Sequence, residues 1–202
     1  MKKVLWLDVD GVLLDYTRAF IKFADIQVDY HEMQEYDLVR YFDSKQACEN
    51  VMNEFLLSEQ FSFLRPLVET PLLFALKNVG YEIRAITRIP ALSTARYKRV
   101  VNLLTYFGSI FDEIVFTNAG QCKYSYLLDR LHEEKKLCHY TVVEDDPVFL
   151  KTANDRNHIG ITAYGVLHPY NTRACFPLLH VAGYRSFNDI ARMLIEKEVS
   201  VG

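Results

Sequence analysis

The stretch Val4-Leu5-Trp6-Leu7-Asp8-Val9-Asp10-Gly11 lies near the start of the chain and decides how the rest is interpreted. Its four consecutive apolar residues are typical of a short strand covered by other structure on both faces. Asp8 and Asp10 follow, and residues i and i+2 of an extended chain point the same way, roughly 6–7 Å apart. Two such charges at the end of a buried strand repel each other, so they stay ionised only beside a cation or hydrogen-bond donors. Gly11 then lets the backbone turn sharply.

Further along the chain, strand-like and helix-like segments alternate. The strand candidates are residues 81–86, 113–116, 140–143 and 158–163. The helix candidates are residues 70–80, 92–107, 121–134 and 187–197, and the second of these has an apolar stripe at Val100, Val101, Leu104 and Phe107. This alternation predicts a parallel α/β sheet with right-handed crossovers. Residues 164–184 are expected to be irregular.

Residues 16–66 break the alternation, because they separate the first strand from the next strand–helix unit. They include an amphipathic helix whose apolar face carries Ala47, Val51, Met52, Phe55 and Leu56. An insertion of this length is either part of the core or a lid over a site, and we favour a small helical lid. Most of its aromatic side chains would form the lid's own core, while others could stack on a substrate.

Composition excludes several classes of protein. The 202 residues are 50% hydrophobic and 24% charged, which excludes a disordered chain. A net charge of -3 gives no basic footprint for a nucleic-acid partner. No apolar run approaches the roughly 20 residues of a membrane span, and the first residues lack a secretory apolar region, so we expect a cytoplasmic protein. Four cysteines and six histidines are scattered, which favours reduced thiols and no zinc cluster.

Polar side chains follow the later predicted strands as well. Thr87 offers a hydroxyl donor after the second strand, and Lys123 begins the helix that follows the third. The fourth strand ends in Glu144-Asp145-Asp146, a run that is costly unless a divalent cation shares it. Each residue also has an ordinary structural interpretation: a turn threonine, a surface lysine, and for Asp146, directly before a proline, a helix N-cap. We therefore rank Asp145 first and Glu144 second as metal ligands.

In chain order, the D-x-D pair, the threonine, the lysine and the acidic run resemble the haloacid dehalogenase superfamily of phosphohydrolases. The resemblance spans Lys3 to about Lys197 and is most specific at residues 8–13. It implies an α/β fold with a Rossmann-like parallel sheet flanked by helices and a small helical cap inserted after the first strand. Residues 1–15 and 67–202 would form the core domain and residues 16–66 the cap.

The same resemblance implies a Mg²⁺-dependent phosphomonoester hydrolase that acts on a small phosphorylated metabolite through an aspartyl-phosphate. Asp8 would be the nucleophile and Asp10 the general acid and base. Thr87 and Lys123 would hold the phosphoryl oxygens. Mg²⁺ would be bound by the carboxylate of Asp8, the backbone carbonyl of Asp10, and Asp145.

The sequence departs from the family pattern at Arg88, which follows Thr87 where small or amide residues are common. Arg88 is either a substrate contact or an exposed charge. Together with Arg65, Tyr30 and His31, it is a candidate selector of the substrate.

Several other functions use a similar set of residues. A phosphotransferase or mutase of the same family would pass the group to another acceptor, and a non-catalytic regulator would pass it to none. A receiver domain also gathers acids, a threonine and a lysine around Mg²⁺, but it has no long insertion after its first strand. A dehalogenase has no need of the acid at Asp10, because a halide leaves without a proton.

Overall fold

The computed structural model describes residues 2–118, 120–134, 138–175 and 178–200, in which six parallel strands form one sheet. The strands are β1 (Lys2–Asp8), β2 (Tyr81–Arg88), β3 (Glu113–Thr117), β4 (Cys138–Glu144), β5 (Ile161–Val166) and β6 (Ala182–Tyr184). Their order is β3-β2-β1-β4-β5-β6. The order reverses between β1 and β4, and open α/β sheets bind ligands beyond the carboxyl ends of the strands at such a point. Receiver domains have a different strand order, so the fold excludes that alternative.

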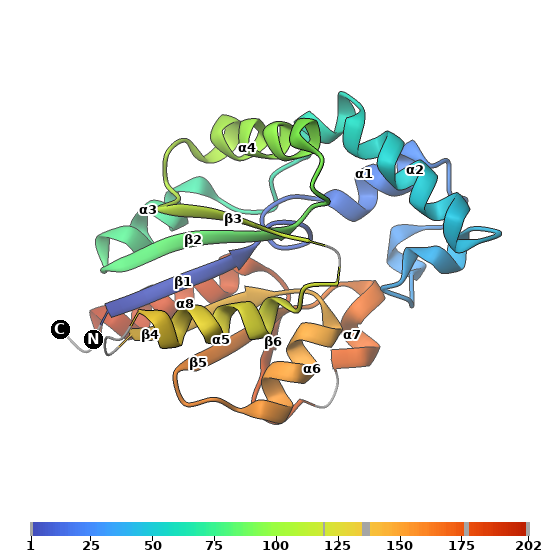
Figure 1. Ribbon diagram of the computed structural model, residues 1–202. Coiled ribbons are helices and arrows are strands. Elements are labelled where there is room, and N and C mark those ends of the chain that lie inside the picture. Colours follow the sequence, from blue (N-terminus) through green and yellow to red (C-terminus); the bar gives the residue numbers. More distant parts are fainter. Residues whose placement is uncertain (1, 119, 135–137, 176–177, 201–202) are drawn as a thin grey trace.

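Helices cover both faces of the sheet, and the helices of residues 16–66 lie beyond the carboxyl ends of its strands (Figure 1). The α-helices are α1 (Tyr16–Phe23), α2 (Lys45–Leu57), α3 (Thr70–Asn78), α4 (Ser93–Phe107), α5 (Lys123–Glu133), α6 (Pro147–Arg156), α7 (Pro169–Cys175) and α8 (Phe187–Val199). Short 3₁₀ turns are η1 (Tyr30–Glu32), η2 (Leu38–Tyr41) and η3 (Gln60–Phe63). No helix in the described ranges is long and apolar enough to cross a bilayer.

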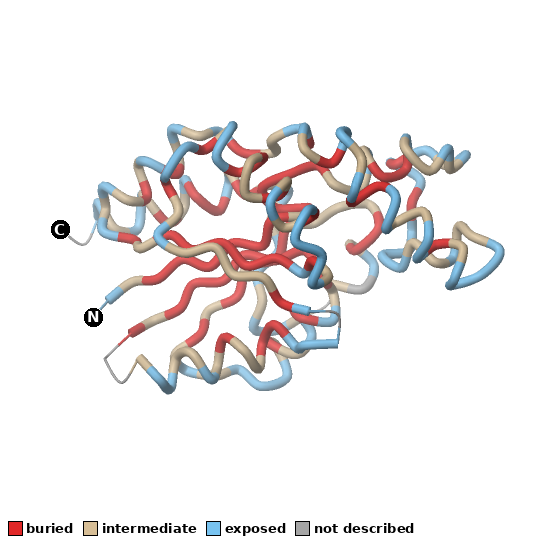
Figure 2. The backbone as a smooth tube through the Cα atoms, turned by 45° about the horizontal axis from the view of Figure 1, so that its top comes forward, coloured by how far each residue is buried: buried red, intermediate tan, exposed pale blue. Residues whose placement is uncertain are grey.

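The apolar core follows from the alternation of side chains along the strands. In β1, Leu5 and Leu7 pack with α3, α4 and α8, whereas Val4 and Trp6 pack with α5 and α6 on the other face. Figure 2 shows this buried layer running along the strands between helices with exposed outer faces. The sheet is therefore a rigid platform whose carboxyl edge can hold polar side chains in place.

Residues 16–66 share their core with the sheet. Phe20, Phe55 and Phe61 are fully buried in the same apolar cluster as Leu5 and Leu7. The rings of Phe55 and Phe61 lie 5.7 Å apart in an edge-to-face arrangement. The segment is helical, and its apolar core continues into that of the sheet. The division into a core domain (1–15 and 67–202) and a cap (16–66) stays a prediction.

All five strands expected from the sequence are present, but the expectation of an irregular 164–184 segment is wrong. This segment contains the end of β5, α7 and the edge strand β6, which pairs in parallel with β5. Both α7 and β6 are short elements with little local signal. They are held by their neighbours: α7 packs on α6 and η1, and β6 packs on α8.

The buried face of α4 also differs from the apolar stripe expected for it. The buried residues are Ala95, Arg99, Asn102, Leu103 and Phe107, whereas the side chain of Leu104 is 49% exposed. Two polar residues occupy the inner face, so a pattern of apolar residues alone could not identify it.

Candidate active site

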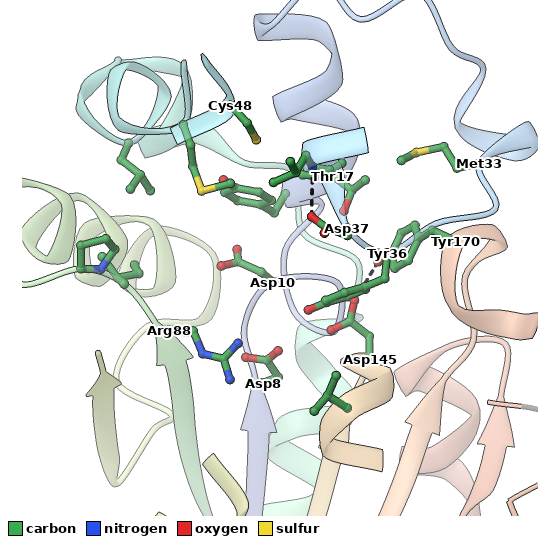
Figure 3. Close-up of a pocket in the computed structure, with 18 of the residues that line it drawn as sticks. Asp8, Asp10, Thr17, Met33, Tyr36, Asp37, Cys48, Arg88, Asp145 and Tyr170 are labelled. Carbon is green, nitrogen blue, oxygen red and sulfur yellow. Dashed lines mark hydrogen bonds between the residues drawn. The ribbon is translucent and has the colours of Figure 1, made fainter. Parts of the chain in front are cut away.

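A cavity of about 490 Å³ lies beyond the carboxyl ends of β1, β2 and β4. Its floor carries the polar side chains Asp8, Asp10, Arg88, Lys123 and Asp145, and much of its wall comes from residues 16–66. Figure 3 shows Asp8, Asp10, Arg88 and Asp145 on one side of this space, with Met33 and Cys48 on the other. Four of the site residues expected from the sequence therefore line one cavity.

Thr87, the fifth expected residue, lies beside this group. It is the penultimate residue of β2, and the preceding residue Ile86 is in register with Asp8. Thr87 is fully buried, and its hydroxyl has no hydrogen-bond partner in the described residues. Such an unpaired hydroxyl is costly unless a ligand accepts from it.

Lys123 connects the ends of β1 and β4. As the first residue of α5, it directs its Nζ to Asp8 Oδ1 at 2.7 Å and to Glu144 Oε2 at 2.9 Å. Lys123 is 4% exposed, so it is no surface lysine. Burial would lower the pKa of Lys123, but the charges of Asp8 and Glu144 outweigh it and raise that pKa. Burial would likewise raise the pKa of Asp8, and Lys123 holds it below its ordinary value.

Three buried carboxylates form a cluster that suits a hard cation. Asp8, Glu144 and Asp145 each offer an oxygen, and these atoms lie within 4.8 Å of one another. Asp145 Oδ1 is buried without a hydrogen-bond partner in the described residues. Burial and the charge on Asp8 raise the pKa of Glu144 and Asp145 well above their ordinary values, and a bound cation would lower both. When all three carboxylates are ionised, they and the one ammonium leave two surplus negative charges, which a divalent ion would neutralise.

Neighbouring groups fix the orientation of Asp145. Its Oδ2 accepts from the Tyr170 hydroxyl at 2.8 Å, and its backbone oxygen accepts from Asn171 Nδ2 at 2.7 Å. Gly11, at φ +80°, lies so close that a Cβ there would overlap the Asp145 carboxylate. A glycine is therefore required for the turn after β1 to lie against Asp145.

Asp146 has the structural role that the following proline suggested. Its Oδ1 accepts from the backbone N–H of Val148 at 2.8 Å and caps α6. Its Oδ2 lies 3.6 Å from Arg88 Nη1. The Arg88 side chain is 41% exposed and lines the cavity, so it is a surface charge that also faces the site.

Asp10 is paired with an arginine that the sequence did not single out. Arg99 Nη2 lies 2.5 Å from Asp10 Oδ1, and its guanidinium lies 4.5 Å from the ring centroid of Phe61. Arg99 is fully buried, and its Nε and Nη1 have no partner in the described ranges. Burial and the charge of Asp8 raise the pKa of Asp10, while Arg99 opposes the rise. The sequence signal that could have identified Arg99 is its spacing of three residues from Asn102, which places both polar side chains on the same face of α4.

His168 links residues 16–66 to the turn after β1. Its Nε2 lies 2.6 Å from the backbone oxygen of Gly11, and its Nδ1 lies 2.8 Å from the hydroxyl of Tyr30. A carbonyl only accepts, so Nε2–H donates, and the neutral ring accepts from Tyr30 at Nδ1. The rings of His168 and Tyr170 are stacked, with centroids 4.9 Å apart. His168, Tyr170 and Asn171 were missed because they lie in the segment expected to be irregular.

Of the four candidate selectors, Arg88 alone is among the cavity-lining residues; Arg65, Tyr30 and His31 are not. The hydroxyl of Tyr30 contacts His168 instead of the cavity, and the guanidinium of Arg18 lies 3.8 Å from the centroid of the Tyr30 ring.

Comparison with known proteins supports the fold. No protein-family model matches the chain, and no curated protein matches it. Among solved structures, it resembles one assigned as a haloacid dehalogenase-like hydrolase from Burkholderia xenovorans, with 15% identity over 96% of this chain and 97% of the other and a TM-score of 0.63. A structure assigned as a beta-phosphoglucomutase from Thermotoga maritima has 21% identity, coverage of 97% and 99%, and a TM-score of 0.60.

A third similar structure is a D,D-heptose bisphosphate phosphatase from B. bronchiseptica in complex with magnesium and phosphate. It shares 16% identity over 98% of this chain and 99% of the other, with a TM-score of 0.58. The chain therefore has the fold of the haloacid dehalogenase-like hydrolases, which confirms at the level of the fold the resemblance seen in the sequence.

Proposed function

We propose that the protein is a Mg²⁺-dependent phosphomonoester hydrolase that acts on a small phosphorylated metabolite through an aspartyl-phosphate. The observation that carries the proposal is the buried cluster of Asp8, Glu144 and Asp145, with Lys123 as its ammonium partner, on the floor of a cavity. Nothing in a packed core requires such an acidic surplus, because uncompensated buried charges are destabilising.

Asp8 is the proposed nucleophile. One of its carboxylate oxygens forms a bond to phosphorus while the bond from phosphorus to the leaving oxygen breaks. Asp10 donates a proton to that oxygen, which leaves as an alcohol. Asp10 then accepts a proton from a water molecule that attacks the aspartyl-phosphate, which releases inorganic phosphate and restores Asp8. The pairing with Arg99 keeps the Asp10 carboxylate at the edge of the cavity.

The residues present fit a magnesium ion, since the donors are oxygens and one of them, Asp145 Oδ1, has no other partner in the described residues. The proposed ligands are the Asp8 carboxylate, the Asp10 backbone carbonyl and Asp145. When bound, the ion would supply positive charge that offsets the repulsion between carboxylates and phosphate. Asp146 Oδ1 caps α6 and both oxygens of Glu144 accept hydrogen bonds, which supports the first rank of Asp145 among the acids of this run.

Thr87 and Lys123 are the proposed phosphate-binding residues. The Thr87 hydroxyl has no hydrogen-bond partner among the described residues, and Lys123 supplies the buried positive charge. Residues 16–66 are the proposed cap, on the argument that they supply much of the cavity wall opposite these groups.

Release of inorganic phosphate from p-nitrophenyl phosphate tests the proposal. We expect turnover with Mg²⁺ and loss of turnover with a chelator, with recovery when Mg²⁺ is restored. Absence of release from any ester at saturating Mg²⁺ would overturn the proposal and favour the regulatory alternative. Transfer of the phosphoryl group to an added alcohol instead of water would favour a phosphotransferase.

A further inference from the structure

The wall that residues 16–66 contribute to the cavity is predominantly apolar. It includes side chains from the connection between η1 and η2, from η2 and from α2: Met33, Tyr36, Leu38, Val39, Met52 and Leu56. Met33 and Leu56 are 2% and 4% exposed, whereas Tyr36 is 39% exposed, so part of the wall is buried and part is open to solvent. We call these six residues the apolar wall. A group held against this wall loses water, which is favourable for apolar surface and costly for unpaired hydroxyls.

The charges of the cavity are distributed unevenly. Within the described lining, the positive side chains, Arg88 and Lys123, both belong to the floor. Lys123 is engaged by Asp8 and Glu144. The charged residue contributed by residues 16–66 is Asp37, whose Oδ1 accepts from the backbone N–H of Val39 at 3.0 Å. A second phosphate or a carboxylate on a substrate would therefore meet a negative charge at the wall.

We propose, on the basis of the phosphatase function above, that the substrate is a monophosphate ester of an uncharged, ring-sized apolar alcohol. The phosphoryl group lies on the floor, and an aromatic or alicyclic body packs on the apolar wall. The cavity of about 490 Å³ has room for a phosphate and one such body. The lining also holds the hydroxyls of Tyr16, Thr17 and Tyr36, but five of the six wall residues offer a sugar hydroxyl no hydrogen-bond partner, which disfavours sugar phosphates. Bisphosphates are disfavoured by the charge of Asp37.

Matched esters test this inference. Cyclohexylmethyl phosphate and the phosphate of glucose at its primary hydroxyl are both primary-alcohol esters on a six-membered ring, so their intrinsic reactivities are similar. We expect kcat/KM to favour the cyclohexyl ester by more than about tenfold. Equal values, or a preference for the glucose ester, would overturn the inference.

A variant of the wall shows whether the preference arises there. Met52→Gln keeps the length of the side chain but adds an amide, and we expect the preference to fall several-fold. Leu57→Gln is the matched control, because Leu57 is on the same helix, 50% exposed and outside the cavity lining. A ratio that stays at the wild-type value in Met52→Gln, with thermal stability retained, would contradict the assignment of the wall.

The bisphosphate of cyclohexane dimethanol tests whether the charge of Asp37 disfavours a second phosphate. Asp37→Asn removes the charge but keeps an oxygen that can cap η2. We expect this variant to raise the ratio of kcat/KM for the bisphosphate to kcat/KM for the monophosphate several-fold. No change in this ratio would overturn the role of Asp37. If p-nitrophenyl phosphate is hydrolysed but the preferences are absent, this inference alone fails; if no ester is hydrolysed, the proposed function fails with it.

Discussion

Two clusters of charged side chains lie at opposite ends of the same sheet, and they differ in charge balance. At the amino end, Arg84 of β2 is 6% exposed in its side chain and contacts Glu82, Glu113 and Glu134. Lys2 and Arg130 join the cluster, so three positive residues face three negative ones. At the carboxyl end, Asp8, Glu144 and Asp145 face Lys123.

The difference indicates what each cluster is for. The amino-end cluster is balanced in charge by its own members, as expected of a structural network, although Arg130 Nε has no hydrogen-bond partner in the described residues. The carboxyl-end cluster retains a negative surplus. It also includes an Asp145 oxygen and a Thr87 hydroxyl for which the described part of the chain provides no hydrogen-bond partner. Such a set is complete only with a partner from outside the chain, here proposed to be Mg²⁺ and a phosphate ester.

The largest expected effect comes from the carboxyl end. Asp8→Asn removes the proposed nucleophile, so kcat for p-nitrophenyl phosphate should fall by at least about a thousandfold. The free energy of unfolding should change far less than the activation free energy does, because the substitution also removes a charge that repels Glu144 and Asp145. The control is Asp155→Asn, since Asp155 is an exposed residue of α6 that pairs with Lys151. Wild-type turnover in Asp8→Asn would refute the mechanism.

A smaller effect on turnover is expected at Arg99. Arg99→Met leaves Asp10 without its partner, so kcat should fall about tenfold to a hundredfold while KM changes little. Arg192→Met removes an exposed ion pair on α8 and should leave both constants unchanged. A change confined to KM would show that Arg99 acts on substrate binding and does not position the general acid.

At the amino end, the expected effect is on stability alone. Arg84→Met leaves Glu82 and Glu134 without their buried cation and should lower the free energy of unfolding by about 2 kcal/mol. Urea unfolding measures the change, and kcat should stay at the wild-type value. Loss of turnover in a folded Arg84→Met protein would remove the distinction between the two clusters.

The smallest effect is a pH dependence of the amino-end cluster. Burial would raise the pKa of Glu134, but the hydrogen bond and charge of Arg84 hold it below its ordinary value of 4.5. A carboxylate with a lowered pKa adds stability above its ordinary pKa and loses it as the pH falls. In Glu134→Gln, the free energy of unfolding should therefore decrease less than in the wild type as the pH falls below about 4.5. The difference between the two proteins should be less than about 1 kcal/mol. An unchanged slope in urea unfolding at acid pH would contradict this.

The sequence was most informative where a local pattern and its chemistry coincide. The apolar run before Asp8 identified the central strand, and Lys123 and Asp145 followed from their places at strand and helix ends. Arg99 was not predictable, because its partner Asp10 lies 89 residues away in the sequence. In addition, an arginine interrupts the apolar pattern by which the buried face of a helix is identified. His168 and Tyr170 were missed for a related reason: α7 and β6 are short, and their packing partners, not their own sequence, determine them.

Calorimetric titration with Mg²⁺ measures whether the acidic cluster at the carboxyl end of the sheet binds a cation. We expect one Mg²⁺ site in the wild-type protein, with an affinity at least about tenfold weaker in Asp145→Asn and unchanged in Glu134→Gln at the other end of the sheet. Asp145→Asn keeps an oxygen that can accept from Tyr170, so its fold should be retained. Absence of Mg²⁺ binding in the wild type, or equal affinity in Asp145→Asn, would show that this acidic cluster is not a magnesium site.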